Sequence, residues 1–289
     1  MTMNSQHDEN ALSISLFQHQ GAREAQEDAY CVAPIYPGHL LAVFDGHCGA
    51  QVAQTAALRL PGLFANHLDR LGVRHAGEAL RLTLQDLIAL CANGCPQKGH
   101  LPPAGATVTA AFVAPSPDGC HYDVVAGVLG DSPLFALCPD HPHGRVIGPE
   151  HSVATSPEDV TRIRQSHAEA MQDGRLHITP HYLETWTNYL APTRSLGDPD
   201  FGEFLIQEPE MLAFRVLRGD PLLLATDGIH DYSGDTQVRH MHYERLLRIA
   251  RNGLHAREVG FQTLMEMERR TVREHRDFQP DNLTLLIVR

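Results

Sequence analysis

Four aspartates in this sequence stand at the ends of short apolar runs that are typical of buried strands. They are Asp45, Asp131, Asp227 and Asp281. Glu27 and Asp28 add two acids at the start of an earlier apolar run. Carboxylate oxygens without a paired set of histidines or cysteines suit Mg²⁺ or Mn²⁺ rather than zinc. A single Asp-Gly pair is also a common turn, but the joint pattern predicts a magnesium or manganese site.

The elements that must bring these acids together alternate between blocks of strands and pairs of helices. Apolar or alternating runs predict strands at residues 14–19, 28–33, 40–44, 107–113, 122–129, 134–138, 211–217, 221–225 and 283–288. Apolar side chains at intervals of three and four residues predict helices at residues 50–68, 78–91, 235–251 and 257–274. Strands in blocks with paired helices favour an α+β fold, with helices outside antiparallel sheets, over a doubly wound parallel sheet.

A further helix is expected to begin beside Ser156 and to run through Arg164. Pro157 suits the first helical position, because its missing N–H has no partner there. Ser156 and Asp159 resemble a capping box in which Asp159 replaces the usual glutamate.

The composition is that of a folded globular chain with enough apolar material for a sizeable core. Of the 289 residues, 43% are hydrophobic, and 23 basic against 35 acidic residues give a formal charge of −12. Lys98 is the only lysine, and no basic cluster offers the footprint that a nucleic-acid backbone needs. No apolar run approaches the roughly 20 residues that cross a bilayer. We therefore expect neither nucleic-acid binding nor a membrane span.

The N-terminus and the cysteines favour a cytoplasmic location, with the nucleus as the alternative. Residues 1–12 read as a polar tail without the apolar segment of a secretory signal. Without export, the six cysteines are expected to remain thiols. They are Cys31, Cys48, Cys91, Cys95, Cys120 and Cys138. Cys91 and Cys95 lie one helical turn apart, but no second pair with zinc spacing accompanies them.

Seven short motifs, in their order along the chain, resemble those of the metal-dependent serine/threonine protein phosphatases of type 2C. They run from about residue 21 to the C-terminus and are Arg23-Glu24-Ala25-Gln26-Glu27-Asp28, Val43-Phe44-Asp45-Gly46-His47-Cys48-Gly49, Gly105-Ala106-Thr107, Gly130-Asp131-Ser132, Thr193-Arg194-Ser195-Leu196-Gly197-Asp198, Ala225-Thr226-Asp227-Gly228-Ile229-His230-Asp231 and Asp281-Asn282. The resemblance implies a sandwich of two packed antiparallel sheets flanked by pairs of helices. Since the acids must meet at one site, residues 13–289 are expected to form one catalytic domain.

The resemblance also implies the ligands of two or three Mg²⁺ or Mn²⁺ ions. Asp45 would bridge two ions, Glu27 and the Gly46 carbonyl would bind one of them, and Asp227 and Asp281 would bind the other.

Three more acids have supporting parts in this scheme. Asp28 and Asp231 would act mostly through waters, and Asp131 would bind a third, weaker ion. The implied activity is hydrolysis of phosphoserine and phosphothreonine in signalling phosphoproteins by direct attack of a metal-bridging hydroxide, without a phosphoenzyme.

Three other residues match motif positions with catalytic parts, and each has a plainer alternative. Arg23 would clamp the substrate phosphate, or it forms a surface ion pair with Glu24 or Glu27. His47 would protonate the leaving oxygen, or it is a buried structural histidine. Thr107 would orient water at the site, or it is an ordinary strand threonine.

The sequence departs from the family pattern in four places. Pro133 replaces an arginine, His230 an aromatic or apolar residue, and Cys48 a small residue. Residues 165–189 differ from the family's substrate-contacting flap. These departures keep two alternatives open: a catalytically weak pseudophosphatase that binds phosphoproteins or regulates, and a phosphatase of small molecules. A monomer is expected.

Overall fold

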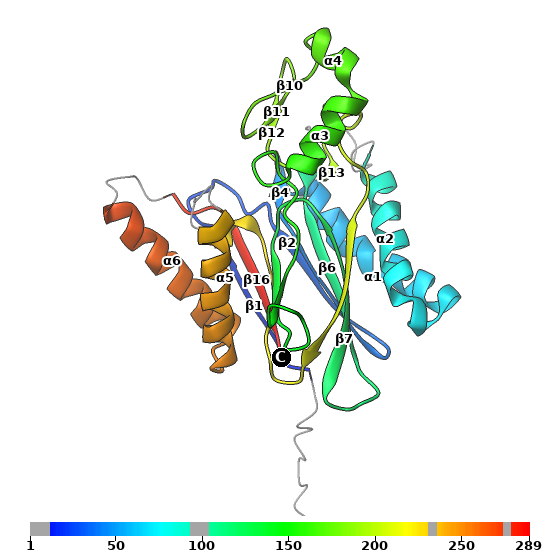
Figure 1. The fold of residues 1–289 in the computed structure, drawn as a ribbon, viewed down its shortest axis with the longest axis vertical. Coiled ribbons are helices and arrows are strands. Elements are labelled where there is room, and N and C mark those ends of the chain that lie inside the picture. Colours follow the sequence, from blue (N-terminus) through cyan, green and yellow to red (C-terminus); the bar gives the residue numbers. More distant parts are fainter. Residues whose placement is uncertain (1–11, 93–103, 231–235, 274–278) are drawn as a thin grey trace, which may run out of the picture.

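Four layers follow one another across the molecule, which is described here by a computed structural model (Figure 1). The structure describes residues 12–92, 104–230, 236–273 and 279–289. Two five-stranded sheets pack face to face in the centre. Helices α1 (Gln51–Leu71) and α2 (Ala76–Cys91) cover one sheet, and α5 (Thr236–Arg251) and α6 (Ala256–Arg273) cover the other. The predicted α+β fold with this layering is confirmed.

Both large sheets are antiparallel throughout. The first has the order β1–β16–β15–β8–β9, with strands Ile14–His19, Leu283–Val288, Leu222–Ala225, Leu134–Leu137 and Arg145–Ile147. The second has the order β14–β7–β6–β3–β2, with strands Glu210–Leu217, His121–Leu129, Val108–Pro115, Gly38–Phe44 and Ala29–Ile35. Ile14 pairs with Val288 and His19 with Leu283. The first strand and the last are therefore neighbours, although they lie at opposite ends of the sequence.

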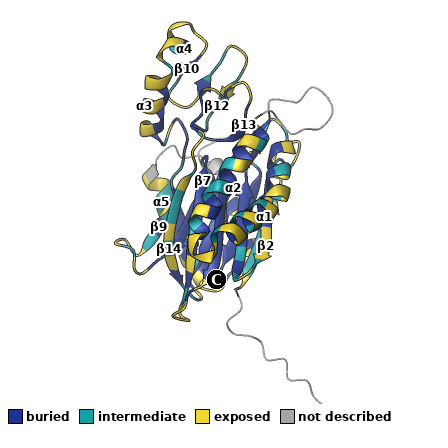
Figure 2. Ribbon diagram, turned by 90° about the vertical axis from the view of Figure 1, so that its right-hand side faces the viewer, coloured by how far each residue is buried: buried dark blue, intermediate teal, exposed yellow. Residues whose placement is uncertain are grey.

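Alternate residues of the central strands pack on opposite sides, as the two-residue period of a strand requires. In β3, Leu40 and Phe44 face the core under α1 and α2, whereas Leu41 and Val43 face the other sheet. Because both faces are covered, strands that lack polar alternation are buried along their whole length, as the dark blue strands of Figure 2 show.

Short elements gather at one end of the sandwich. The strands β4 (Gly46–His47), β5 (Gly105–Ala106) and β13 (Leu196–Gly197) form a small sheet there. A 3₁₀ turn, η2 (Asp227–Ile229), follows β15, and a second one, η1 (Val73–His75), joins α1 to α2.

A lobe at residues 157–190 rises above this end of the sandwich (Figure 1). It contains α3, α4, β10, β11 and β12, with bounds Pro157–Ser166, Ala168–Gln172, His177–Ile178, Leu183–Glu184 and Tyr189–Leu190. Its buried residues form a small core of their own together with residues 201–206.

The long elements match their sequence predictions closely. The strand at residues 283–288 is observed with the predicted bounds, and the four long helices differ from prediction by three residues or fewer at each end. Short strands such as β4, β5 and those of the lobe were not predicted, because two residues cannot display a period.

The capping box predicted at Ser156 is wrong. Helix α3 does begin at Pro157 after Ser156, but the Ser156 side chain makes no capping hydrogen bond. The Asp159 carboxylate is instead bound by Arg194 and Thr193, which lie far away in the sequence.

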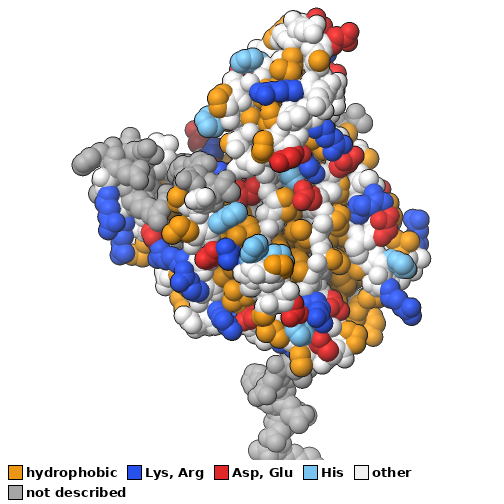
Figure 3. Space-filling view, in the orientation of Figure 1, with side chains coloured by type: hydrophobic (Ala, Val, Ile, Leu, Met, Phe, Trp, Pro, Cys, Tyr) orange, Lys and Arg blue, Asp and Glu red, His pale blue; other side chains and the backbone are white. Residues whose placement is uncertain are grey.

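Basic side chains are interspersed with acidic and apolar ones on the face shown in Figure 3. Within the described ranges, no helix is both long and apolar enough to cross a bilayer. The described cysteines, Cys31, Cys48, Cys91, Cys120 and Cys138, are thiols. The predicted polar tail up to residue 11, Cys95, Lys98 and Asp231 lie outside the described residues.

Candidate metal centre and active site

The predicted acids meet at the end of the sandwich below the lobe. Asp45 lies between β3 and β4, Asp131 follows β7, Asp227 begins η2, and Asp281 precedes β16. A cavity of about 330 Å³ is lined by Asp131, Asp227 and Asp281, together with Ser152, Ala154, His181, Tyr182, Ala191, Gly228, His230, Arg239 and Met267. The fold therefore gathers carboxylates from sheet ends that are as much as 236 residues apart, from Asp45 to Asp281.

Asp45 is fixed through its backbone and stands against Asp227. Its N–H donates to Thr107 Oγ1 at 3.2 Å, and its carbonyl accepts from the Thr107 N–H at 2.9 Å. Its Oδ2 accepts from the backbone N–H of Asp227 at 3.3 Å. Thr107 Oγ1 also lies 2.6 Å from Ser132 Oγ, beside Asp131. Thr107 thus joins the Asp45 and Asp131 loops, while its predicted part in orienting water stays a prediction.

Three of these acids are poorly accommodated as anions. Burial raises the pKa of Asp45 well above its ordinary value, and the charges of Asp227 and Asp28 raise it further. Burial followed by the charges of Asp227 and Glu150 raises the pKa of Asp131 to about 7. The pKa of Asp227 is raised by burial and by Asp281, although a hydrogen bond shared with the Asp45 carboxyl opposes the rise.

Asp28 is buried beneath the site with one oxygen unpartnered. Its Oδ2 accepts from the hydroxyls of Thr226 and Thr284, both at 2.8 Å. Its Oδ1 is buried and has no hydrogen-bond partner. Burial raises the pKa of Asp28 to about 7, and the charges of Asp227 and Asp281 contribute. An unsatisfied buried carboxylate oxygen costs free energy, so this atom indicates a place for a bound cation or its water.

Asn282 fastens the N-terminal loop to the site. Its Oδ1 accepts from the backbone N–H of Glu27 at 2.8 Å, and its Nδ2 donates to the carbonyls of Gln20 and Ala25. A Cβ at Gly46 would lie 2.2 Å from the Glu27 carbonyl oxygen, so only glycine permits this approach. Asn282 belongs to the Asp281-Asn282 motif, but the motif resemblance implies no role for Asn282. Its position next to Asp281 in the sequence does not reveal its hydrogen bonds to the N-terminal loop.

Arg23 lies at the exposed edge of the site and forms an ion pair with Asp281. The surface-pair alternative named Glu24 or Glu27 as partners, whereas the partner in the structure is 258 residues away. Its side chain is 59% exposed, so the guanidinium is accessible to an anion that arrives from solvent. The clamp role stays a prediction.

His47 is held by Asp198 in a small pocket of its own. His47 Nε2 lies 2.7 Å from Asp198 Oδ1, and the Ser195 hydroxyl donates to Asp198 Oδ2 at 2.5 Å. A Cβ at Gly105 would lie 2.4 Å from His47 Nε2, which excludes other residues at that position.

The charge state of His47 follows from this pairing. Burial alone would lower its pKa, but the hydrogen bond and charge of Asp198 outweigh burial, and Asp131 and Glu27 add to them, so the pKa is raised. The raised pKa favours the protonated ring, and the acid role of His47 stays a prediction. The sequence pattern includes Asp198 in a motif but gives it no role, and its φ of +50° marks it as an unusual backbone position.

The structure describes the three single residues that depart from the family pattern. Pro133 uses its carbonyl to accept from the Ala225 N–H at 3.0 Å. Cys48 is exposed beside His47, with a φ of +57°. His230 is half-buried in the wall of the cavity, and burial lowers its pKa to about 3 with help from Arg239 and His242.

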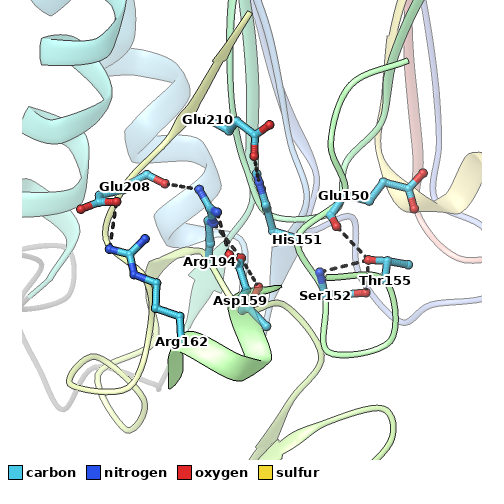
Figure 4. A network of polar contacts seen from close by, with 10 residues as sticks. Glu150, His151, Ser152, Thr155, Asp159, Arg162, Arg194, Glu208 and Glu210 are labelled. Atoms are coloured by element: carbon cyan, nitrogen blue, oxygen red, sulfur yellow. Dashed lines mark hydrogen bonds and ion pairs between the residues drawn. The ribbon is translucent and has the colours of Figure 1, made fainter. Parts of the chain in front are cut away.

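A second buried carboxylate lies nearby, where the lobe joins the sandwich (Figure 4). Asp159 receives two hydrogen bonds from Arg194, both at 2.7 Å, and one from Thr193 at 2.8 Å. Arg194 also donates to the Glu208 carbonyl at 2.8 Å. Burial would raise the pKa of Asp159, but the Arg194 contacts outweigh burial and lower it.

The side chains of the site offer the ligand type that divalent cations prefer, although they do not converge into a preformed metal site. All the carboxylates supply hard oxygen ligands, as Mg²⁺ and Mn²⁺ prefer. Across the parts of the chain that the structure describes, no three His, Cys, Asp or Glu side chains converge in a metal-holding arrangement. Burial, followed by repulsion from neighbouring acids, raises the pKa values of Asp45 and Asp131, and a bound cation would offset both effects.

Curated proteins are similar to this chain over most of its length. The chain is 28% identical over 204 residues to protein phosphatase 2C 50 of Oryza sativa subsp. japonica, covering 68% of this chain and 52% of that protein. It is 29% identical over 233 residues to probable protein phosphatase 1N of Mus musculus, covering 73% and 51%. The chain spans about half the length, or less, of the curated relatives it matches first.

Solved structures share the fold. A serine-threonine phosphatase 2C from Toxoplasma gondii superposes with a TM-score of 0.65 at 17% identity, covering 96% of this chain and 94% of that one. A C. elegans sex-determining protein gives a TM-score of 0.66 at 22% identity, covering 96% and 64%. The profile of the family Protein phosphatase 2C matches residues 13–274. The chain therefore belongs to the protein phosphatase 2C family.

Proposed function

We propose that this chain is a metal-dependent protein phosphatase that hydrolyses phosphoserine and phosphothreonine. The observation that carries the proposal is the gathering of acids with raised pKa values at one end of the sandwich, where Asp131 and Asp227 line a cavity and Asp45 stands against Asp227. Such an arrangement is costly for folding and is explained by a cation that the acids bind. Residues 13–289 would act as one catalytic unit, with the cytoplasm as the proposed location.

The ligands are assigned as the motif resemblance implies. Glu27, Asp45 and the Gly46 carbonyl would hold one Mg²⁺ or Mn²⁺, and Asp45, Asp227 and Asp281 would hold a second. When bound, the ions supply Lewis acidity that activates water and neutralises phosphate charge.

Three more acids complete the assignment. The unpartnered Oδ1 of Asp28 would take a water of the centre, as would Asp231, and Asp131 would hold a third, weaker ion.

Two side chains of the chain itself serve the phosphoryl group. The exposed Arg23 guanidinium would leave Asp281 for the phosphate oxygens, where two parallel N–H donors match two acceptors. Asp198 holds Nε2 of His47, so the protonated ring presents its other N–H, at Nδ1, to the leaving oxygen.

The experiment measures hydrolysis of a phosphoserine and phosphothreonine peptide panel and of p-nitrophenyl phosphate, with Mn²⁺, Mg²⁺ or EDTA. We expect peptide hydrolysis with either ion at millimolar concentration and none in EDTA. Asp45→Asn is the inactive control. Full activity in EDTA would refute metal dependence. Hydrolysis of aryl phosphate alone would favour a small-molecule phosphatase, and phosphopeptide binding without turnover would favour a pseudophosphatase.

A further inference from the structure

One face of helix α5 is turned toward the site, and its Arg239 lines the same cavity as Asp131 and Asp227. Arg239, His242 and Tyr243 are three and four residues apart, so they lie on the same side of the helix. Arg239 donates to Glu150 Oε2 at 2.5 Å, and its charge acts on both Asp131 and Asp227. His242 Nε2 lies 3.1 Å from the carbonyl oxygen of Ile229, in the turn that begins with Asp227.

Tyr243 is the centre of this contact. Its side chain is fully buried, and its ring stacks on Phe135 with centroids 4.6 Å apart. Its hydroxyl donates to Glu150 Oε1 at 2.7 Å and lies 2.8 Å from Nδ1 of His230. In Figure 4 the Glu150 carboxylate points away from the Asp159 network. Its two oxygens accept hydrogen bonds from side chains of α5 instead. Arg239 balances the charge of the buried Glu150, since the two side chains are only 13% and 7% exposed.

His230 connects Tyr243 to the site, because it lines the same cavity as Asp131 and Asp227. An aromatic or apolar residue, which the family pattern usually has at this position, lacks the ring nitrogen that contacts the Tyr243 hydroxyl. His230 and Tyr243 therefore depend on each other, because each supplies the hydrogen-bond partner for a polar atom of the other. We call Glu150, His230, Arg239 and Tyr243 the α5 cluster.

We propose that the α5 cluster positions Asp131 for cation binding, with Tyr243 as the positioning residue that joins helix α5 to the Asp131 loop. The inference rests on the proposed metal-dependent function. Groups that hold a metal ligand in place commonly change metal affinity or activity by about 10- to 100-fold when they are removed. Removal of the Tyr243 hydroxyl would leave Glu150 Oε1 and a His230 nitrogen unpaired, and the Asp131 loop would lose its fixed position.

The test is calorimetric titration of Mn²⁺ into wild type, Asp131→Asn and Tyr243→Phe. The binding step that Asp131→Asn abolishes should be about tenfold weaker in Tyr243→Phe, while the other steps are unchanged. Phenylalanine keeps the stack on Phe135, and thermal unfolding verifies the fold. Tyr122→Phe is the matched control, because Tyr122 is also buried but lies at the start of β7, where the strand is farthest from Asp131. It should leave every Mn²⁺ step unchanged.

A double-mutant cycle distinguishes one connected cluster from separate contributions. If the cluster acts as a unit, His230→Phe should weaken the same Mn²⁺ step, and His230→Phe with Tyr243→Phe should weaken it no more than the larger single effect. Unchanged Mn²⁺ affinity in Tyr243→Phe, or losses that multiply in the double variant, would overturn the inference. A wild type that binds no Mn²⁺ at all would instead overturn the proposed function.

Discussion

Carboxylates at two places near the same end of the molecule differ in their partners. Asp159 is buried but held by the guanidinium of Arg194, and its pKa is lowered (Figure 4). Asp45, Asp131 and Asp227 face mainly one another, and their pKa values are raised. Asp159 is therefore stable as an anion, and the site acids are not.

The difference separates structure from function. A buried acid with an arginine partner joins two parts of the fold, here the lobe and the sandwich, and it needs no further counter-charge. Buried acids that repel one another destabilise the protein unless a cation binds. The same residue type thus has opposite consequences, and substitutions at the two places should have opposite effects on stability.

The largest effect is expected at the site. Asp45→Asn or Asp227→Asn removes an anionic ligand without changing side-chain size, and turnover should fall by at least about 10³-fold, equivalent to several kcal/mol of the activation barrier. Because repulsion among the acids falls as well, the unfolding temperature in EDTA should rise. The assays are phosphopeptide hydrolysis and thermal unfolding. A folded Asp45→Asn enzyme with the wild-type rate would refute the bridging role.

At the lobe junction the effect on stability should have the other sign. Asp159→Asn leaves Arg194 buried without its counter-charge, and the free energy of unfolding should fall by about 3–5 kcal/mol. Urea unfolding measures this loss. Glu78→Gln, which breaks an exposed pair with Arg81 on α2, is the control and should change little. An Asp159→Asn protein as stable as wild type would show that the junction does not depend on this pair.

His47→Gln tests the acid role on two substrates. An alkoxide leaving group needs a proton, whereas a nitrophenolate largely does not, so phosphopeptide hydrolysis should slow by roughly 10²-fold and nitrophenyl phosphate hydrolysis much less. Both rates and the unfolding temperature are measured on one preparation. Equal losses on the two substrates, with a lowered unfolding temperature, would assign His47 a structural role instead.

The smallest effect is the pH dependence of the metal-free protein. Asp28 and Asp131 have pKa values of about 7 in the folded state, above the ordinary value of 3.8. Between about pH 4 and 7 the folded state therefore binds more protons than the unfolded state, and stability should fall as the pH rises. In EDTA the unfolding temperature should be a few degrees higher at pH 5 than at pH 8.

A matched variant tests the cause of this slope. Asp131→Asn should flatten it, whereas Asp159, whose pKa is lowered, affects stability only below about pH 4. A slope that is unchanged in Asp131→Asn would mean that other groups are responsible.

The sequence predicts the parts of this fold that are long and apolar. The strand at residues 283–288 has a covered face on each side, so its run of residues, apolar except for Thr284, indicates both its ends. The helices follow from their apolar spacing. The two-residue strand β4, which consists of Gly46 and His47, depends on pairing with the distant β5, and no local pattern records this pairing.

For the site, the sequence supplies the acids and the order of their motifs, and the fold supplies their partners. The predicted cap at Asp159 failed because Arg194, 35 residues away, competes successfully for the carboxylate. Arg23 pairs with Asp281, and His47 with Asp198, through contacts that arise only when β1 meets β16 and when β4 and β13 both pair with β5. The α5 cluster is likewise invisible in the sequence, since Glu150 and Tyr243 are 93 residues apart.

Mn²⁺-dependent thermal unfolding at neutral pH tests the central claim most directly, because it asks whether a cation relieves the repulsion among the site acids. A ligand at 100 times its dissociation constant stabilises the folded state by about 2.7 kcal/mol. Mn²⁺ should therefore raise the unfolding temperature of wild type by several degrees, and of Asp159→Asn by a similar amount, but not that of Asp45→Asn. No rise in wild type, or an equal rise in Asp45→Asn, would contradict the account.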